Sequence, residues 1–210
     1  MASSDHALRQ FVATIVADNQ REFTRLLDAS PELAMASFQS GATREDPSPY
    51  YLDAIGRYIV AGDTALHIAA AAYRTEMARL LIDAGANVHA VDRHGEQPIH
   101  AAAVGIPGSR MWNPSAQAAT LFCLVQAGAD PNSADKRGVA PLHRAVRTRC
   151  AEAVRVLLEC GADPALANAN GSTPMLLATE NTGRGGAGSQ EAKEQQQEIA
   201  RLLRQALGTA

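Results

Sequence analysis

Aromatic residues and long apolar runs are both scarce in this 210-residue sequence. Phenylalanine, tyrosine and tryptophan make up 4% of the chain, although hydrophobic residues reach 46%. This balance is typical of alanine-rich helix packing rather than of a large aromatic core. No stretch approaches about 18 consecutive apolar residues, and residues 1–5 (MASSD) lack the basic start and apolar run of a secretion signal. We therefore expect a soluble, intracellular protein with no membrane partner.

Cysteine is rare, and neither sign of charge is in large excess. Cys123, Cys150 and Cys160 are odd in number and fall in predicted helices, so we expect free thiols rather than a disulfide framework. Free thiols indicate a reducing compartment, the cytoplasm. The 19 basic and 22 acidic residues leave a formal net charge of −3, which is too close to neutral to indicate a nucleic-acid or membrane binder.

Four segments of the sequence resemble one another at a spacing of about 33 residues. Each contains a turn, a short apolar stretch and a longer apolar stretch. In the first copy Leu66 and Ala69 recur at helical spacing, and Met77, Leu80 and Leu81 repeat the pattern one helix later. Such units cannot bury their apolar faces alone, so a stacked solenoid is expected. The segments are residues 62–94, 95–137, 138–170 and a fourth that begins at Gly171.

Two short motifs recur in register within these segments, one opening the first helix and one closing the second. Proline suits the first helical turn because its missing N–H would have no partner there, and glycine suits a left-handed helix cap. The opening motifs are Thr64-Ala65-Leu66-His67, Gln97-Pro98-Ile99-His100, Ala140-Pro141-Leu142-His143 and Thr173-Pro174-Met175-Leu176. The closing motifs are Gly85-Ala86-Asn87, Gly128-Ala129-Asp130 and Gly161-Ala162-Asp163. Over about 150 residues these motifs resemble the ankyrin-repeat family.

The resemblance implies an all-α solenoid of stacked ankyrin repeats, with about five units including degenerate caps at both ends. Phe11 and Ile15 keep helical spacing without the opening motif, which is typical of an N-terminal cap, and the polar helix 190–207 is typical of a C-terminal one. We expect residues 1–210 to form a single domain. Its predicted parts are a cap at 5–34, an insertion at 35–61, repeats at 62–94, 95–137 and 138–170, and a cap at 171–207, with further insertions near 106–115 and 181–190.

The insertions are where this chain departs from the repeat pattern. The first contains Tyr50, Tyr51 and Tyr58, which could form a binding loop or could fold back to cover the stack. In the second, Trp112 could anchor a partner or could pack locally against Phe122 or Met111. By register the second and third insertions emerge on one rim, opposite the hairpin tips. The third is glycine-rich but lacks the Lys-Ser/Thr ending that a phosphate-binding loop needs.

The sequence predicts no catalytic residue, no cofactor and no metal site, and therefore no enzyme. His67, His100 and His143 occupy one repeat position, and the resemblance implies that this histidine is structural and hydrogen-bonds the neighbouring loop. His89, Asp92 and His94 share one hairpin, but no cysteine joins them and the next repeat has Asn132, Asp135 and Arg137 at the matching positions.

A basic cluster is the clearest sign of a binding surface. Residues 136–155 hold six Lys or Arg and one acidic residue, Glu152, which suits an acidic or phosphorylated partner or is simply a solvated face. Partners of ankyrin proteins commonly dock on the hairpin tips and inner helices. By register those positions are Arg93, His94, Glu96, Lys136, Arg137, Val139, Arg147 and Thr148.

The sequence thus predicts a non-enzymatic protein–protein interaction module, an adaptor or a regulator, in which this strip and the tyrosine-rich insertion contact a protein partner. The pattern favours no particular oligomeric state. The alternative is a small-molecule or enzymatic site formed by the insertions, with Tyr50, Tyr51 and Trp112 around a pocket. Nucleic-acid binding by the arginine cluster is a third hypothesis, for which steep salt dependence would be the signature.

Overall fold

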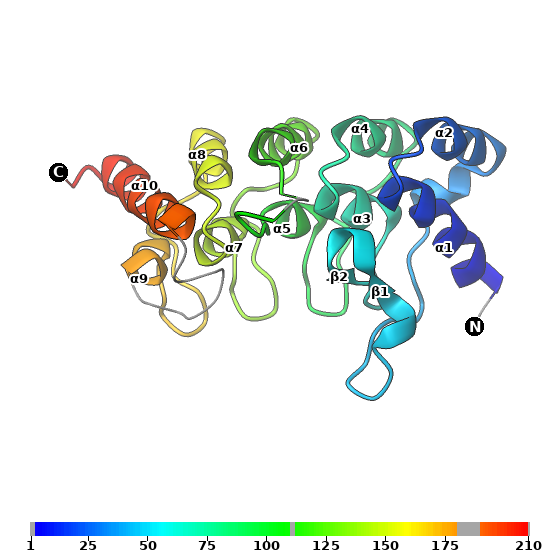
Figure 1. Ribbon diagram of the computed structural model, residues 1–210, viewed down its shortest axis with the longest axis horizontal. Coiled ribbons are helices and arrows are strands. Elements are labelled where there is room, and N and C mark those ends of the chain that lie inside the picture. Colours follow the sequence, from blue (N-terminus) through cyan, green and yellow to red (C-terminus); the bar gives the residue numbers. More distant parts are fainter. Residues whose placement is uncertain (1–2, 110–111, 180–189, 210) are drawn as a thin grey trace.

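Pairs of short helices stack side by side in the computed structural model, which describes residues 3–109, 112–179 and 190–209. One row contains α1, α3, α5, α7 and α9, and a second row, above the first in the view, contains α2, α4, α6, α8 and α10 (Figure 1). The pairs are α1 (Ser3–Val16) with α2 (Gln20–Ala29), α3 (Ala65–Ala71) with α4 (Thr75–Asp83), α5 (Pro98–Ala102) with α6 (Pro114–Gln126), α7 (Pro141–Arg147) with α8 (Ala151–Glu159), and α9 (Pro174–Thr179) with α10 (Gln190–Leu207). The arrangement confirms the predicted all-α ankyrin solenoid.

The proline and glycine positions of the two motifs set the helix boundaries. Helices α5, α7 and α9 each begin at the proline of the opening motif. Gly85, Gly128 and Gly161 follow the second helices with φ of +94°, +98° and +89°, a conformation that favours glycine, so the predicted left-handed caps are confirmed.

Small side chains let the inner helices approach closely. Ala69, Ala70, Ala102 and Ala145 are fully buried where α3, α5 and α7 pack in sequence. At the N-terminal end larger residues fill the space, with the rings of Phe11 and Phe23 stacked 5.0 Å apart. The core is therefore continuous from α1 to α10 rather than divided between repeats.

The first insertion forms a small two-stranded hairpin, β1 (Tyr51–Leu52) and β2 (Arg57–Tyr58), with one 3-10 turn before β1 (Ser48–Tyr50) and another between the strands (Asp53–Ile55). Its base is fixed to the stack: Phe38 is buried, and its N–H donates to the carbonyl of Asp63. The buried Asp5 carboxylate accepts the N–H groups of Gln39 and Ser40 at 3.0 and 3.2 Å. The hairpin projects in front of α3, on the side from which the loops between repeats extend (Figure 1).

Candidate functional site

The hairpins between repeats are built on one recurring side-chain hydrogen-bond pattern. Asp92 Oδ1 accepts the N–H of His94 at 2.7 Å and of Glu96 at 2.9 Å. Asp135 and Asn168 accept the equivalent pairs of N–H groups, at 2.7 to 3.0 Å. Each side chain satisfies donors that a tight turn would otherwise leave unpaired, so the hairpins share one rigid shape.

Buried histidines connect each repeat to the hairpin of the next. The Nδ1 atoms of His67, His100 and His143 each accept a backbone N–H from the start of their own helix at 3.1 Å. Nε2 therefore carries the proton, and it donates to the carbonyls of Glu96, Val139 and Ser172 at 3.0 to 3.1 Å. The predicted structural role is confirmed.

Burial keeps these imidazole rings neutral. It lowers the pKa of His100 to about 4, assisted by the nearby Arg144 cation and opposed by the hydrogen bond to Val139. Burial also lowers the pKa of His67 and of His143. A neutral ring is the form that donates through one nitrogen and accepts through the other, as this geometry requires.

Backbone hydrogen bonds join the hairpin tips into a row. The N–H of Arg93 donates to the carbonyl of Ala61 at 2.8 Å, that of Lys136 to His94 at 3.0 Å, and that of Ala169 to Arg137 at 3.0 Å. Lys136 Nζ also donates to the carbonyl of Arg93 at 2.8 Å. The side chains of Arg93, His94, Lys136 and Arg137 are exposed along this row, and we call these four residues the tip row.

The other predicted strip residues lie behind the tip row. Arg147 and Thr148 are half-buried at the end of α7. Val139 is only 6% exposed, so its side chain belongs to the core and its carbonyl, not its surface, serves the hairpin. Glu96 is half-buried and forms an ion pair with Arg144. The structure thus brings together on the surface only part of the predicted strip.

Arg144 links two hairpins through an ion-pair cluster that the sequence analysis missed. Its Nη2 contacts Glu96 and lies 3.4 Å from Oδ2 of the fully buried Asp135 carboxylate. Burial raises the pKa of Glu96, and the Arg144 cation opposes that rise. Burial also acts to raise the pKa of Asp135, but the N–H groups of Val139 and Arg137 outweigh it and the pKa is lowered.

The three tyrosines of the first insertion differ in their exposure. Tyr50 is half-buried, and the Arg9 guanidinium lies 4.8 Å from its ring centre. Tyr51 and Tyr58 face each other across the two strands, with ring centres 4.7 Å apart, and remain 43% and 45% exposed. The covering hypothesis therefore describes Tyr50, and binding by the exposed Tyr51 and Tyr58 stays a prediction.

Trp112 is half-buried and packs locally. Its Nε1 donates to Oε1 of the buried Gln117 at 3.1 Å, and Gln117 in turn donates to the carbonyl of Ala102 at 2.9 Å. A Cβ on Gly105 would lie 2.8 Å from the Trp112 ring, so the ring lies directly on the backbone there. Phe122 is 53% exposed on α6, and Met111 lies outside the described residues.

A groove of about 610 Å³ lies between the first two insertions. Tyr58 and Arg57 form one wall, and Ile106 and Trp112 lie in the loop on the other side. Alanines from the ends of α3 and α5 form part of its lining, with Arg74 and Arg144 among the polar residues. Sequence reasoning could not assign Arg57 and Arg74 to this groove because they belong to segments that meet only in the folded stack.

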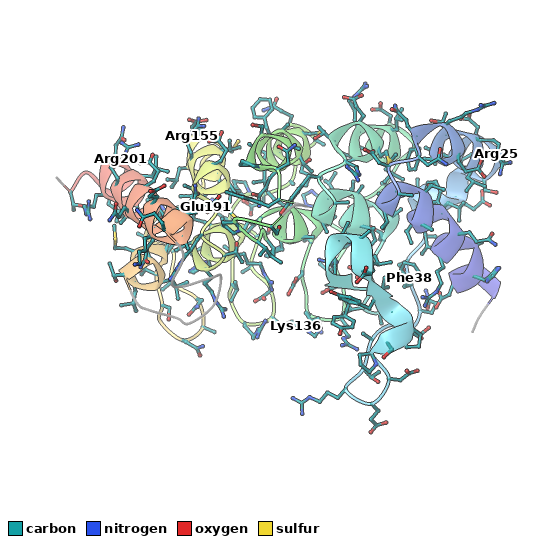
Figure 2. All side chains as sticks on the ribbon, in the orientation of Figure 1. Arg25, Phe38, Lys136, Arg155, Glu191 and Arg201 are labelled. Atoms are coloured by element: carbon teal, nitrogen blue, oxygen red, sulfur yellow. The ribbon has the colours of Figure 1, made fainter. Side chains whose placement is uncertain are left out.

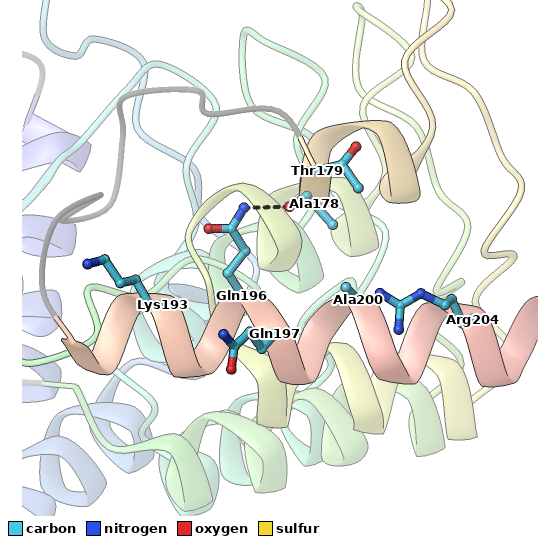
Figure 3. A pocket seen from close by; sticks show the side chains of 7 residues that line it. All are labelled: Ala178, Thr179, Lys193, Gln196, Gln197, Ala200 and Arg204. Atoms are coloured by element: carbon cyan, nitrogen blue, oxygen red, sulfur yellow. Dashed lines mark hydrogen bonds between the residues drawn. The ribbon is translucent and has the colours of Figure 1, made fainter. Parts of the chain in front are cut away.

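A second hollow, of about 550 Å³, lies between α9 and α10 at the C-terminal end. A side-chain hydrogen bond from Nε2 of Gln196 to the carbonyl of Ala178, at 2.7 Å, joins the two helices there (Figure 3). Lys193 and Arg204 lie at opposite ends of the lining (Figure 3), so its charged groups do not converge on one point. The predicted third insertion, near 181–190, falls outside the described residues except for Gln190.

Within the described parts of the chain, no group of three or more His, Cys, Asp or Glu side chains could hold a metal ion. The helices described here are all too short or too polar to span a membrane. The three cysteines are free thiols, as predicted.

Comparison with known proteins agrees with this geometry. Residues 61–93 match the family model described as "Ankyrin repeat", and residues 124–178 match the model described as "Ankyrin repeats (many copies)". The chain is also 39% identical over 119 residues to the B-cell lymphoma 3 protein homolog of Mus musculus, an alignment that covers 56% of this chain and 25% of that protein. The chain thus spans about a quarter of the length of this curated relative.

Ankyrin repeats generally mediate protein–protein interaction, and proteins built from them are typically non-enzymatic. The recurring helix pairs, the histidine links between repeats and the two family matches all lead to one conclusion. The chain contains ankyrin repeats, matched at residues 61–93 and 124–178, and folds as an ankyrin solenoid.

Proposed function

We propose that this chain is a non-enzymatic protein-binding module, an adaptor or a regulator, that presents a rigid surface to a protein partner in the cytoplasm. The observation that carries the proposal is the tip row, whose side chains project from backbone already fixed by hydrogen bonds. Because little backbone has to be ordered on binding, contacts made by such a surface are not offset by a large entropy loss.

The charge of the tip row suits an acidic segment of the partner. Arg93, Lys136 and Arg137 are exposed and lie side by side through the hydrogen bonds between neighbouring hairpins. The carboxylates of the same turns, Asp92 and Asp135, are buried. A partner would therefore meet the cations first, and electrostatic attraction would favour an acidic surface over a basic one.

The small-molecule alternative has one observation in its favour, the groove between the insertions, whose volume of about 610 Å³ is in the range of ligand pockets. An enzymatic role finds less support. The three histidines at the recurring repeat position, His67, His100 and His143, are fully buried and already bonded through both ring nitrogens.

The test compares two double variants with the same change in net charge. Lys136→Glu with Arg137→Glu reverses the tip row, whereas Arg25→Glu with Arg155→Glu reverses two exposed cations on the outer helices. Figure 2 places Lys136 among the loops between repeats, and Arg25 and Arg155 on the opposite edge. Both variants should keep the helical circular dichroism of the wild type, since all four side chains are exposed.

Affinity purification from native lysate, followed by binding measurements on the recovered partner, separates the outcomes. The proposal expects a stoichiometric protein that the tip-row variant loses and the outer-helix variant retains. Equal retention by both variants would remove the tip row as the contact, and a failure to recover any protein would direct attention to the small-molecule alternative.

A further inference from the structure

The groove between the first two insertions has a lining whose charged residues are all cations. Among the described residues that line it, Arg57, Arg74 and Arg144 are charged, and none is an aspartate or a glutamate. The hairpin β1–β2 and the loop that follows α5 lie on either side of this groove. Because these segments interrupt the repeat pattern, the groove is a feature of this chain rather than of the repeat.

Buried carboxylates hold two of these arginines in place from behind. Arg57 Nη2 lies 2.8 Å from Oδ1 of Asp63, which is fully buried. Arg144 is held by the Glu96 and Asp135 carboxylates. The two arginine side chains remain 19% and 20% exposed, and their Nη1 groups make no hydrogen bond within the described residues. In the described part of the chain these Nη1 groups are thus preorganised donors without a protein acceptor.

Exposed apolar side chains stand beside these donors. Tyr58 on the hairpin is 45% exposed and Ile106 on the loop is 58% exposed, and both line the groove. Tyr51 packs against the Tyr58 ring and limits its movement. Rigid aromatic side chains next to arginines are the composition of interface anchors.

We propose that this groove binds an extended segment of a protein partner in which an apolar side chain is followed or preceded by Asp or Glu. The apolar side chain would lie between Tyr58 and Ile106, and the carboxylate would accept from Arg57 or Arg144. This inference rests on the proposed protein-binding function and assigns a second contact surface to it, separate from the tip row.

The acids behind the groove determine which anion fits. Asp63, Glu96 and Asp135 compensate the charge of Arg57 and Arg144, so the groove offers fixed short-range donors rather than a strong positive field. A single carboxylate needs only those donors. A nucleic-acid backbone, in contrast, depends on net positive charge spread over many phosphates.

The experiment selects random dodecapeptides displayed on phage against the full chain and measures the enriched peptides by fluorescence anisotropy. We expect the enriched sequences to share an apolar residue next to Asp or Glu. Replacing Tyr58 and Ile106 together by Ser should weaken their binding on the order of tenfold or more, because the loss of interface anchors costs at least about 1.4 kcal/mol. Replacing Arg57 by Gln should do the same.

Matched controls keep the result interpretable. Phe122→Ser removes an equally exposed apolar side chain from an outer helix, and Arg155→Gln removes an exposed cation there; both should bind the peptides like the wild type. Arg57→Gln leaves the buried Asp63 without its ion pair and could lower the melting temperature. The Tyr58 and Ile106 variant carries the test in that case, since both side chains are exposed.

Several results would overturn the groove assignment. If the tip-row variant lost the peptides and the groove variants kept them, the protein-binding function would stand and the groove would not be the site. The groove proposal also fails if no peptide is enriched, or if the enriched peptides lack Asp and Glu. It fails as well if single-stranded oligouridine, and no peptide, binds the chain in a way that Arg57→Gln abolishes.

Discussion

Acidification should destabilise this protein through the histidines that join its repeats. The pKa of His100 falls from an ordinary value of 6.5 to about 4 on folding, so folding favours the neutral ring. The contribution of the neutral ring to the free energy of unfolding is complete above about pH 6.5. It is lost as the pH falls from there towards about 4, because in that range the unfolded chain binds the proton and the folded chain does not. Between about pH 7 and pH 5 this one residue should lower the free energy of unfolding by about 2 kcal/mol.

The measurement is urea unfolding followed by circular dichroism at several values from about pH 7 to pH 5, on the wild type and on His100→Gln. The variant should be less stable near neutral pH, because two buried hydrogen bonds are disturbed. Its stability should nevertheless depend less on pH. The difference between the two plots of unfolding free energy against pH gives the contribution of His100 separately from that of the carboxylates. Parallel curves across this range would refute the reasoning.

Further substitutions test the turns, the core and one tyrosine. Gly138→Ala should reduce stability by about 1 kcal/mol more than Gly171→Ala: both glycines have positive φ, but the new Cβ at Gly138 would lie 2.7 Å from a backbone nitrogen of the next hairpin, whereas nothing lies within 4 Å at Gly171. Leu121→Ala should cost about 2–5 kcal/mol because the side chain is fully buried, while the exposed neighbour Phe122→Ala should change stability by about 0.5 kcal/mol or less. Tyr73→Phe should cost about 1 kcal/mol, because its hydroxyl donates to a backbone carbonyl after α5. Denaturant midpoints measure all of these, and equal losses within either matched pair would contradict the corresponding assignment.

The repeats could be predicted because local and global signals agree in them. Pro98, Pro141 and Pro174 mark helix starts by their own covalent geometry, and stacking places the helices where those signals predict. The structural role of His100 was predictable for the same reason, since recurrence at one repeat position indicates architecture.

The insertions were predicted only as departures from the pattern. Their shape depends on contacts between distant residues, such as Asp5 with Gln39 and Ser40, and no local pattern records such contacts. The strands around Tyr51 and Tyr58 are two residues long, too short for alternation to be visible. For Val139, register gave the position in the hairpin but not the inward direction of the side chain.

Because the hairpin tips are hydrogen-bonded to one another, equivalent side chains on neighbouring repeats are held at a constant interval. The first two hairpins carry cations at their tips, whereas the equivalent residues of the third are Ala169 and Asn170. A partner whose two acidic groups are separated by that interval can engage both basic hairpins at once, and the second engagement is intramolecular and gains from a high effective concentration. A partner with a different spacing can engage only one hairpin at a time. Discrimination between partners would then arise from multivalency, through the number of matched contacts, even if every single contact is weak.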